Sequence, residues 1–144
     1  MLRPDFAAYD PSGHVRVAID AKRRIGTAAA WAADFRRNAV AHGWIASDAM
    51  FILVTPDKLY AWDRYVDFDA APSAEIAADG IFGPYYARVG ASADSIGSEA
   101  FEMIVSWWLE DVSRGSAGDV APVLHGTGLP EALSGSRIVR QAAA

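Results

Sequence analysis

Three side chains near the start of the chain have the types and spacing that metal-assisted phosphodiester hydrolysis needs. Asp5 and Asp20 are separated by fourteen residues, and Lys22 follows two positions after Asp20. Two carboxylates on one face can share a hard cation, because each oxygen approaches Mg²⁺ to about 2.1 Å. The cation would lower the pKa of a bound water, and the lysine would orient that water or stabilise developing charge. We expect Asp5, Asp20 and Lys22 as catalytic residues, and Asp5, Asp20 and the carbonyl of Ala21 as metal ligands.

These residues must be positioned by an N-terminal β-hairpin. FAAY at 6–9 is typical of a short strand, and DPSG at 10–13 has the residues of a type I turn. HVRVAIDAK at 14–22 alternates polar and apolar residues, as a half-buried strand does. Successive side chains of a strand point to opposite faces, so Asp20 and Lys22 are expected on one face together.

The register of this hairpin decides whether Asp5 joins them. A four-residue turn over 10–13 pairs Asp5 with Ala18 and makes Asp20 a diagonal neighbour of Asp5, at about 7–8 Å between backbones. A three-residue loop would shift the register by one and turn Asp5 to the opposite face. The predicted site therefore depends on the four-residue turn.

A helix, a buried strand and a second hairpin are expected next. Thr27 is the expected N-cap of a helix that ends near His42. Its apolar stripe has spacings of three and four and consists of Ala28, Trp31, Ala32, Phe35 and Ala39. MFILV at 50–54 is apolar throughout, as in a strand buried on both faces, and TPDK turns it into a strand over 59–66.

The C-terminal half predicts helices and a short final strand. Residues 73–90 suggest a helix broken by glycine and proline, and residues 98–112 a strongly amphipathic helix capped by Ser98. The buried stripe of the second helix would be Phe101, Ile104, Val105, Trp108, Leu109 and Val112. The Gly- and Ser-rich tail ends in a predicted strand over 136–140.

Together these elements predict one domain over 1–144, with a core at 3–65, a helical part at 70–113 and a tail at 115–144. The order of strands and helices indicates an α/β or α+β fold, in which helices flank a mixed sheet of about four to five strands.

Composition narrows the classes of protein. The absence of cysteine excludes disulfides and thiolate sites and suits a reducing cytoplasm. No apolar run is long enough for a membrane helix, and the N-terminus MLRPDF lacks a signal-peptide pattern, so we expect a cytoplasmic protein without membrane contact.

The net charge of −5 argues against a general electrostatic grip on nucleic acid. The stretch 22–37, however, holds five basic residues against one acid, Asp34. Arg24, Arg36 and Arg37 are therefore candidate phosphate contacts, with Asp34–Arg37 pairing on a solvated helix face as the alternative.

The same residues resemble a known family. Asp5 preceded by proline, the gap of fourteen residues, the triplet 20–22 at a strand end and the amphipathic helix that follows are similar to the PD-(D/E)XK nuclease superfamily. GTAAAWAADFRRNAVAHG and FILVTPDKLYAWD further resemble uncharacterised bacterial proteins of that superfamily. The resemblance covers residues 3–65. It implies a restriction-endonuclease-like core that cleaves DNA with Mg²⁺ or Mn²⁺, with Asp5 and Asp20 as metal ligands and Lys22 as the catalytic lysine.

Two other hypotheses remain open at this point. The fold could be a catalytically inactive scaffold that binds a protein or nucleic-acid partner. It could also be a structural domain that forms a homodimer through the aromatic helix over 98–112, where an exposed Trp107 would mark the contact surface.

Overall fold

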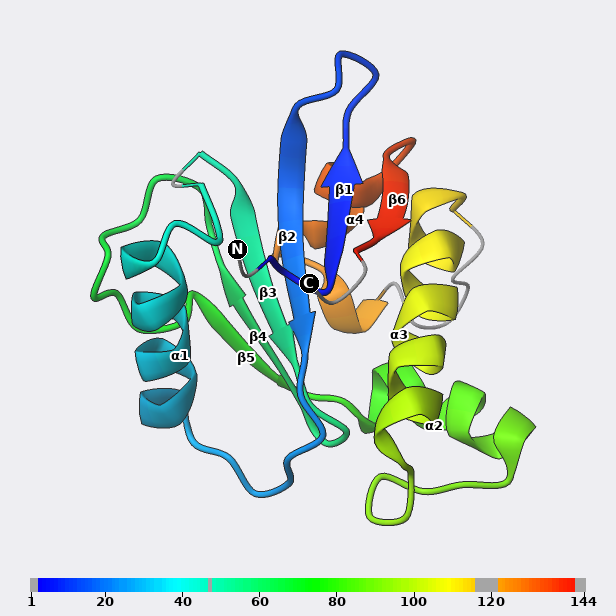
Figure 1. Ribbon diagram of the computed structural model, residues 1–144. Helices are drawn as coiled ribbons and strands as arrows, with labels where there is room; N and C mark the ends of the chain where they lie inside the picture. The colour runs from blue at the N-terminus through cyan, green and yellow to red at the C-terminus, as the bar shows by residue number, and fades with distance from the viewer. Residues whose placement is uncertain (1–2, 47, 116–121, 142–144) are drawn as a thin grey trace.

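The computed structural model describes residues 3–46, 48–115 and 122–141. Within them the chain forms a mixed α/β fold, in which one six-stranded sheet has the order β5-β4-β3-β2-β1-β6 and helices cover both of its faces (Figure 1). The strands are β1 (Phe6–Tyr9), β2 (Val15–Ala21), β3 (Met50–Val54), β4 (Lys58–Trp62), β5 (Ala74–Ala77) and β6 (Arg137–Arg140). The helices are α1 (Ala29–Ala41), α2 (Asp79–Val89), α3 (Ser98–Ser113) and α4 (Leu129–Leu133).

The centre of the sheet is the pair β2 and β3, which run parallel and are connected through α1. The other neighbouring strands pair antiparallel, which makes the sheet mixed. All five residues of β3 are buried, as the uninterrupted apolar run MFILV predicts. The predicted hairpin of β3 and β4 is also confirmed.

The two faces of the sheet pack against different helices (Figure 1). On one face, Ala32 and Ala39 of α1 pack on a layer that includes Ala18, Phe51 and Trp62. On the other face, α2, α3 and α4 cover a larger apolar core. The predicted stripe of α3 is confirmed, because all six of its residues are buried: Phe101, Ile104, Val105, Trp108, Leu109 and Val112.

The prediction of a broken helix over 73–90 is wrong in its first part. Ala74–Ala77 is the strand β5, which pairs with β4 and raises the strand count to six. The helix α2 begins at Asp79 and continues through Pro84. Proline removes one intrahelical hydrogen bond, but the burial of Phe82 edge-on against Phe101 and Trp108, at ring distances of 5.6 and 5.4 Å, holds this helix in the core.

Neither predicted N-cap is in place. The cap of α1 is Ala28, because the hydroxyl of Thr27 instead forms a buried 2.8 Å hydrogen bond with the hydroxyl of Tyr60. The cap of α3 is Gly97, one residue before Ser98. Helix ends are local features that a single tertiary contact can shift by one or two residues.

The tail is part of the fold. The predicted C-terminal strand is confirmed as β6, which pairs antiparallel with β1. The sequence did not predict α4, whose Leu129 and Leu133 are fully buried beside Leu124. Across the described segments, no helix has both the length and the apolar character needed to cross a membrane.

Candidate metal centre

The hairpin register places Asp5 directly beside Asp20. In the register of β1 and β2, Phe6 pairs with Ile19 and Ala7 pairs with Ala18. Extending this register by one pair places Asp5 opposite Asp20. The prediction that Asp5 faces Ala18 is therefore wrong by two residues. Because the shift is even, both carboxylates stay on the same face of the sheet.

Two irregularities, each with an offset of one residue, together produce this even shift. Asp10 donates its amide hydrogen bond to the carbonyl of His14, and Gly13 has a φ of 87°, so the loop has three residues with glycine in the left-handed region. This loop alone would turn Asp5 to the opposite face. A register shift between Ala8 and Tyr9 adds a second residue of offset and restores the parity.

Backbone amides bind the two carboxylates. The amide of Asp5 donates to Oδ1 of Asp20 at 2.9 Å, and the amide of Ala21 donates to Oδ2 of Asp5 at 2.9 Å. The ammonium group of Lys22 lies 3.8 Å from the same oxygen of Asp5. The structure thus brings together all three predicted catalytic residues on the face of the sheet that α1 covers, where Lys22 also lies 5.5 Å from the ring centre of Phe35.

Asp20 is the buried member of the group. Only 1% of its surface is exposed, and its Oδ2 has no hydrogen-bond partner among the described residues. Burial, and then the negative charge of Asp5, raise the pKa of Asp20 to about 7. An ionised carboxylate oxygen without a partner is costly in such a place. A positive charge placed next to Oδ2 would therefore be favourable.

The other two residues of the group, Asp5 and Lys22, are partly exposed to solvent. Their side chains are 27% and 41% exposed, respectively. The arrangement is a half-open corner in which one carboxylate is buried and the other faces water. A small cation and its waters could reach this corner from the solvent side.

The donors fit Mg²⁺ or Mn²⁺. Both available ligand groups are carboxylates, which hard divalent cations prefer, and Mg²⁺ commonly uses one or two carboxylates and keeps several waters. No cluster of three or more His, Cys, Asp or Glu with metal-binding geometry occurs in the described parts of the chain. A bound ion would therefore depend on Asp5, Asp20 and water. The carbonyl of Ala21 remains a predicted further ligand, while its amide is already bound to Asp5.

The predicted phosphate contact at Arg36 is wrong. Its side chain is 4% exposed and points into a loop after β4, where it donates to the carbonyls of Asp67, Phe68 and Val66 at 2.8, 3.3 and 3.5 Å. The guanidinium also lies 5.8 Å from the ring centre of Trp62. Arg36 can occupy a buried position because its guanidinium group donates to loop carbonyls that would otherwise be buried without donors.

The other two candidate arginines lie at the surface, one on α1 and one in the segment that precedes α1. Arg37 forms a 2.6 Å ion pair with Asp34, as the alternative interpretation of this helix face predicted. Arg24 stacks over Trp31, with 5.5 Å between the guanidinium carbon and the ring centre. A phosphate contact by Arg24 stays a prediction.

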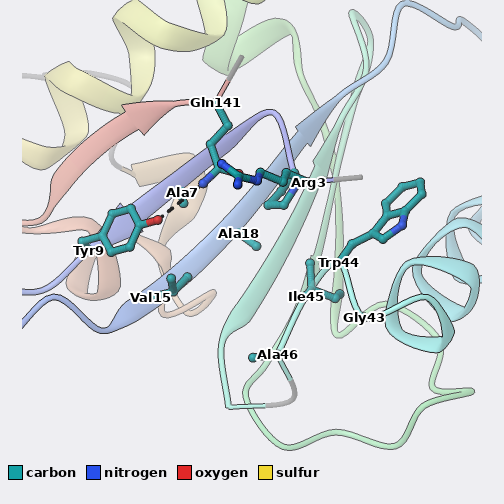
Figure 2. Close-up of a pocket in the computed structure, with 11 residues that line it drawn as sticks. Arg3, Ala7, Tyr9, Val15, Ala18, Gly43, Trp44, Ile45, Ala46 and Gln141 are labelled. Atoms are coloured by element: carbon teal, nitrogen blue, oxygen red, sulfur yellow. Dashed lines mark hydrogen bonds between the residues drawn. The ribbon is translucent and has the colours of Figure 1, made fainter. Parts of the chain in front are cut away.

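A pocket beside the carboxylates was not predicted. It has a volume of about 470 Å³, and its floor is the cross-strand pair Ala7 and Ala18 (Figure 2). The remaining wall residues are Arg3, Pro4, Tyr9, Val15, Gly43, Trp44, Ile45, Ala46 and Gln141. Two alanines paired across the polar face of the hairpin are the sequence signal that could have indicated a hollow here.

Comparison of the chain with models of known protein families, with curated proteins and with solved structures gives no match.

Proposed function

We propose that this protein is a metal-dependent nuclease of the PD-(D/E)XK type, built on a restriction-endonuclease-like core. The observation that carries the proposal is Oδ2 of Asp20, which has no partner among the described residues and is buried beside Asp5, whose own carboxylate lies 3.8 Å from the ammonium group of Lys22. Three chemically matched groups converge there at the end of a hairpin. The mixed sheet with helices on both faces supports the same conclusion.

Each residue has a distinct role in the proposed reaction. Asp5 and Asp20 would hold Mg²⁺, which when bound supplies a Lewis acid for the phosphate and lowers the pKa of water. The two backbone amides that bind the carboxylates keep them in this orientation. Lys22, more exposed than the acids, would orient the attacking water or stabilise negative charge on the phosphate oxygens.

The contacts of the carboxylates also favour a second candidate, an inactive scaffold. One oxygen of each acid accepts a backbone amide, so the pair ties the open end of the hairpin together without any metal. Such a domain would keep the fold and bind a protein or nucleic acid without cleaving it.

A homodimer through α3 is a further candidate with one supporting observation. Met103 and Trp107, one helical turn apart, are 39% and 37% exposed on the face of α3 away from the core. Sedimentation at increasing protein concentration would reveal such a dimer, and Trp107→Ala should weaken it.

Thermal unfolding with added metal tests the central proposal. Millimolar Mg²⁺ or Mn²⁺ should raise the Tm of the wild-type protein, since a ligand that binds only the folded state stabilises it. Asp20→Asn should abolish the increase, whereas Asp34→Asn, which alters an acid paired with Arg37 on the surface, should retain it.

Cleavage then separates the enzyme from the scaffold. Plasmid and single-stranded DNA should be cut by the wild-type protein with Mg²⁺, and neither by Asp20→Asn nor by Lys22→Ala. Metal-dependent stabilisation without cleavage would favour the scaffold. A Tm that does not respond to either metal would contradict the metal centre itself.

A further inference from the structure

We infer that the pocket beside the carboxylates binds one unpaired nucleotide of a single-stranded nucleic acid. The inference rests on the proposed function, and it names the form of substrate that this site would accept. The nucleotide in the pocket would be the neighbour of the phosphate that lies at Asp5 and Asp20.

The pocket and the metal centre lie on one continuous surface. Ala7 and Ala18, on the pocket floor, are two residues from Asp5 and Asp20 along their strands and on the same face. Two residues along a strand span about 7 Å. The backbone of Gln141 is joined to the centre as well, because its amide donates to the carbonyl of Asp5 at 2.8 Å. A strand with its phosphate at the carboxylates would therefore reach the pocket with its next nucleotide.

The walls of the pocket carry the groups that recognise a nucleotide. Figure 2 shows Tyr9 and Gln141 on one side of the two floor alanines, and Trp44 and Ile45 on the other. Trp44 is half-buried, and its two ring neighbours, Phe35 and His42, are tilted by 77° and 47° rather than stacked on it. Figure 2 shows the indole extending from residues 43–46 towards α1, so a base that stacks on it would lie at the outer edge of the pocket.

Two polar side chains add charge and hydrogen bonding. Arg3 is exposed and forms no ion pair with any carboxylate of the described residues, so it is available for a phosphate. Oε1 of Gln141 is buried and accepts no hydrogen bond from the residues that the structure describes, while its Nε2 donates to Tyr9 at 3.4 Å. Rotation of the Gln141 side chain would turn this unused acceptor towards the pocket, where it can receive a hydrogen bond from the amino or imino group of a base edge.

The shape of the pocket favours an unpaired base. Its volume of about 470 Å³ is that of a small-molecule site, walled on one side by residues 43–46 and on the other by the hairpin. A base inside a duplex is stacked on both faces and paired at its edge, so it cannot enter without flipping. The net charge of −5 also disfavours a general grip on duplex backbone.

Binding of labelled oligonucleotides without divalent metal tests the inference. Fluorescence anisotropy in EDTA would compare a short oligothymidylate, a short oligouridylate and a duplex of the same length. The wild-type protein should bind at least one single strand more tightly than the duplex. Arg3→Ala and Trp44→Ala should each raise the Kd at least about fivefold, since one base stack or one phosphate contact is lost. Val89→Ala, which truncates an exposed apolar side chain on α2, over the opposite face of the sheet, should bind as the wild type does.

The outcomes distinguish this inference from the nuclease proposal. Single-strand binding that depends on Arg3 and Trp44, without cleavage when Mg²⁺ is added, would support the pocket and overturn the nuclease. Cleavage that depends on Asp20, with single-strand binding unaffected in Arg3→Ala and Trp44→Ala, would overturn the pocket and leave the nuclease standing. Equal binding of duplex and single strands would also overturn it. Arg3→Ala keeps the test valid if Trp44→Ala unfolds, because Arg3 is exposed and supports no core contact.

Discussion

The backbone amide of Asp5 lies 2.9 Å from Oδ1 of Asp20, so the first acid of the candidate site binds the second through its main chain rather than its side chain. This contact satisfies one oxygen of Asp20, whereas Oδ2 is buried and has no partner within the described part of the chain. The carboxylate of Asp5 is in turn held by the amide of Ala21. Two carboxyl groups are thus fixed side by side by neutral donors, which disfavours ionising both at once unless a cation binds between them.

The first prediction concerns stability against pH without metal. The pKa of Asp20 is raised in the folded protein from an ordinary 3.8 to about 7. The folded state then holds a proton that the unfolded state has lost, so the contribution of Asp20 to stability is full below its unfolded pKa and is lost as the pH rises towards 7. Asp20→Asn should therefore be more stable than the wild type above pH 7, by an amount that shrinks under acidic conditions. Urea unfolding across this range measures it, and parallel curves would contradict the prediction.

The second prediction concerns metal binding against pH. A cation binds the ionised form of Asp20, so protons and metal compete for this carboxylate. The increase in Tm caused by Mn²⁺ should be small at about pH 6 and larger at about pH 8. Asp5→Asn should reduce the increase at both values. An increase of equal size across this range would show that the metal binds elsewhere.

The third prediction separates catalysis from stability at Lys22. Its ion pair with Asp5 is long and partly solvated, so Lys22→Ala should change the free energy of unfolding by less than about 1 kcal/mol. Loss of a charge that stabilises the transition state should lower kcat about a hundredfold or more. Metal-induced stabilisation should persist in this variant. Lys58→Ala is a matched control, because Lys58 on β4 forms an ion pair with Glu75 on the edge strand β5.

The fourth prediction compares the two neighbouring arginines of α1. Arg36→Ala should destabilise the protein by about 2–4 kcal/mol, because it leaves three loop carbonyls without their charged donor. Arg37→Ala removes only an exposed pair with Asp34 and should cost about 0.5 kcal/mol or less. Chemical unfolding of both variants measures the difference. Similar values for the two would show that the burial of Arg36 has no energetic consequence.

The fifth prediction concerns the C-terminal tail. Leu133→Ala should destabilise the protein by about 2–5 kcal/mol, since its side chain is fully buried against the sheet. Glu131→Ala, at an exposed position of the same short helix, should be nearly neutral. If both substitutions left the Tm unchanged, the tail would not be part of the cooperative fold.

Sequence periodicity was sufficient to predict the elements whose side chains are buried in a regular pattern. The stripe of α3 and the uninterrupted apolar strand β3 were predicted residue by residue, because their patterns directly record which faces contact a core. The placement of Asp20 and Lys22 on one face follows from the same rule, since the side-chain period of a strand is two. In Ala74–Ala77, a polar residue between apolar neighbours agrees with the alternating exposure of β5. The helix-forming residues around this segment concealed the strand.

The rest of the candidate site depends on contacts between distant segments. Whether Asp5 joins Asp20 depends on a three-residue loop and a bulge, whose one-residue offsets add to an even shift, and neither is visible in a polar–apolar pattern. The burial of Arg36 depends on loop carbonyls thirty residues away in the chain. The kinds of groups and the strand faces on which they lie follow from local sequence, because residue type and strand alternation are local properties. Their distances, their exposure and the pocket beside them were decided by contacts between segments far apart in the chain.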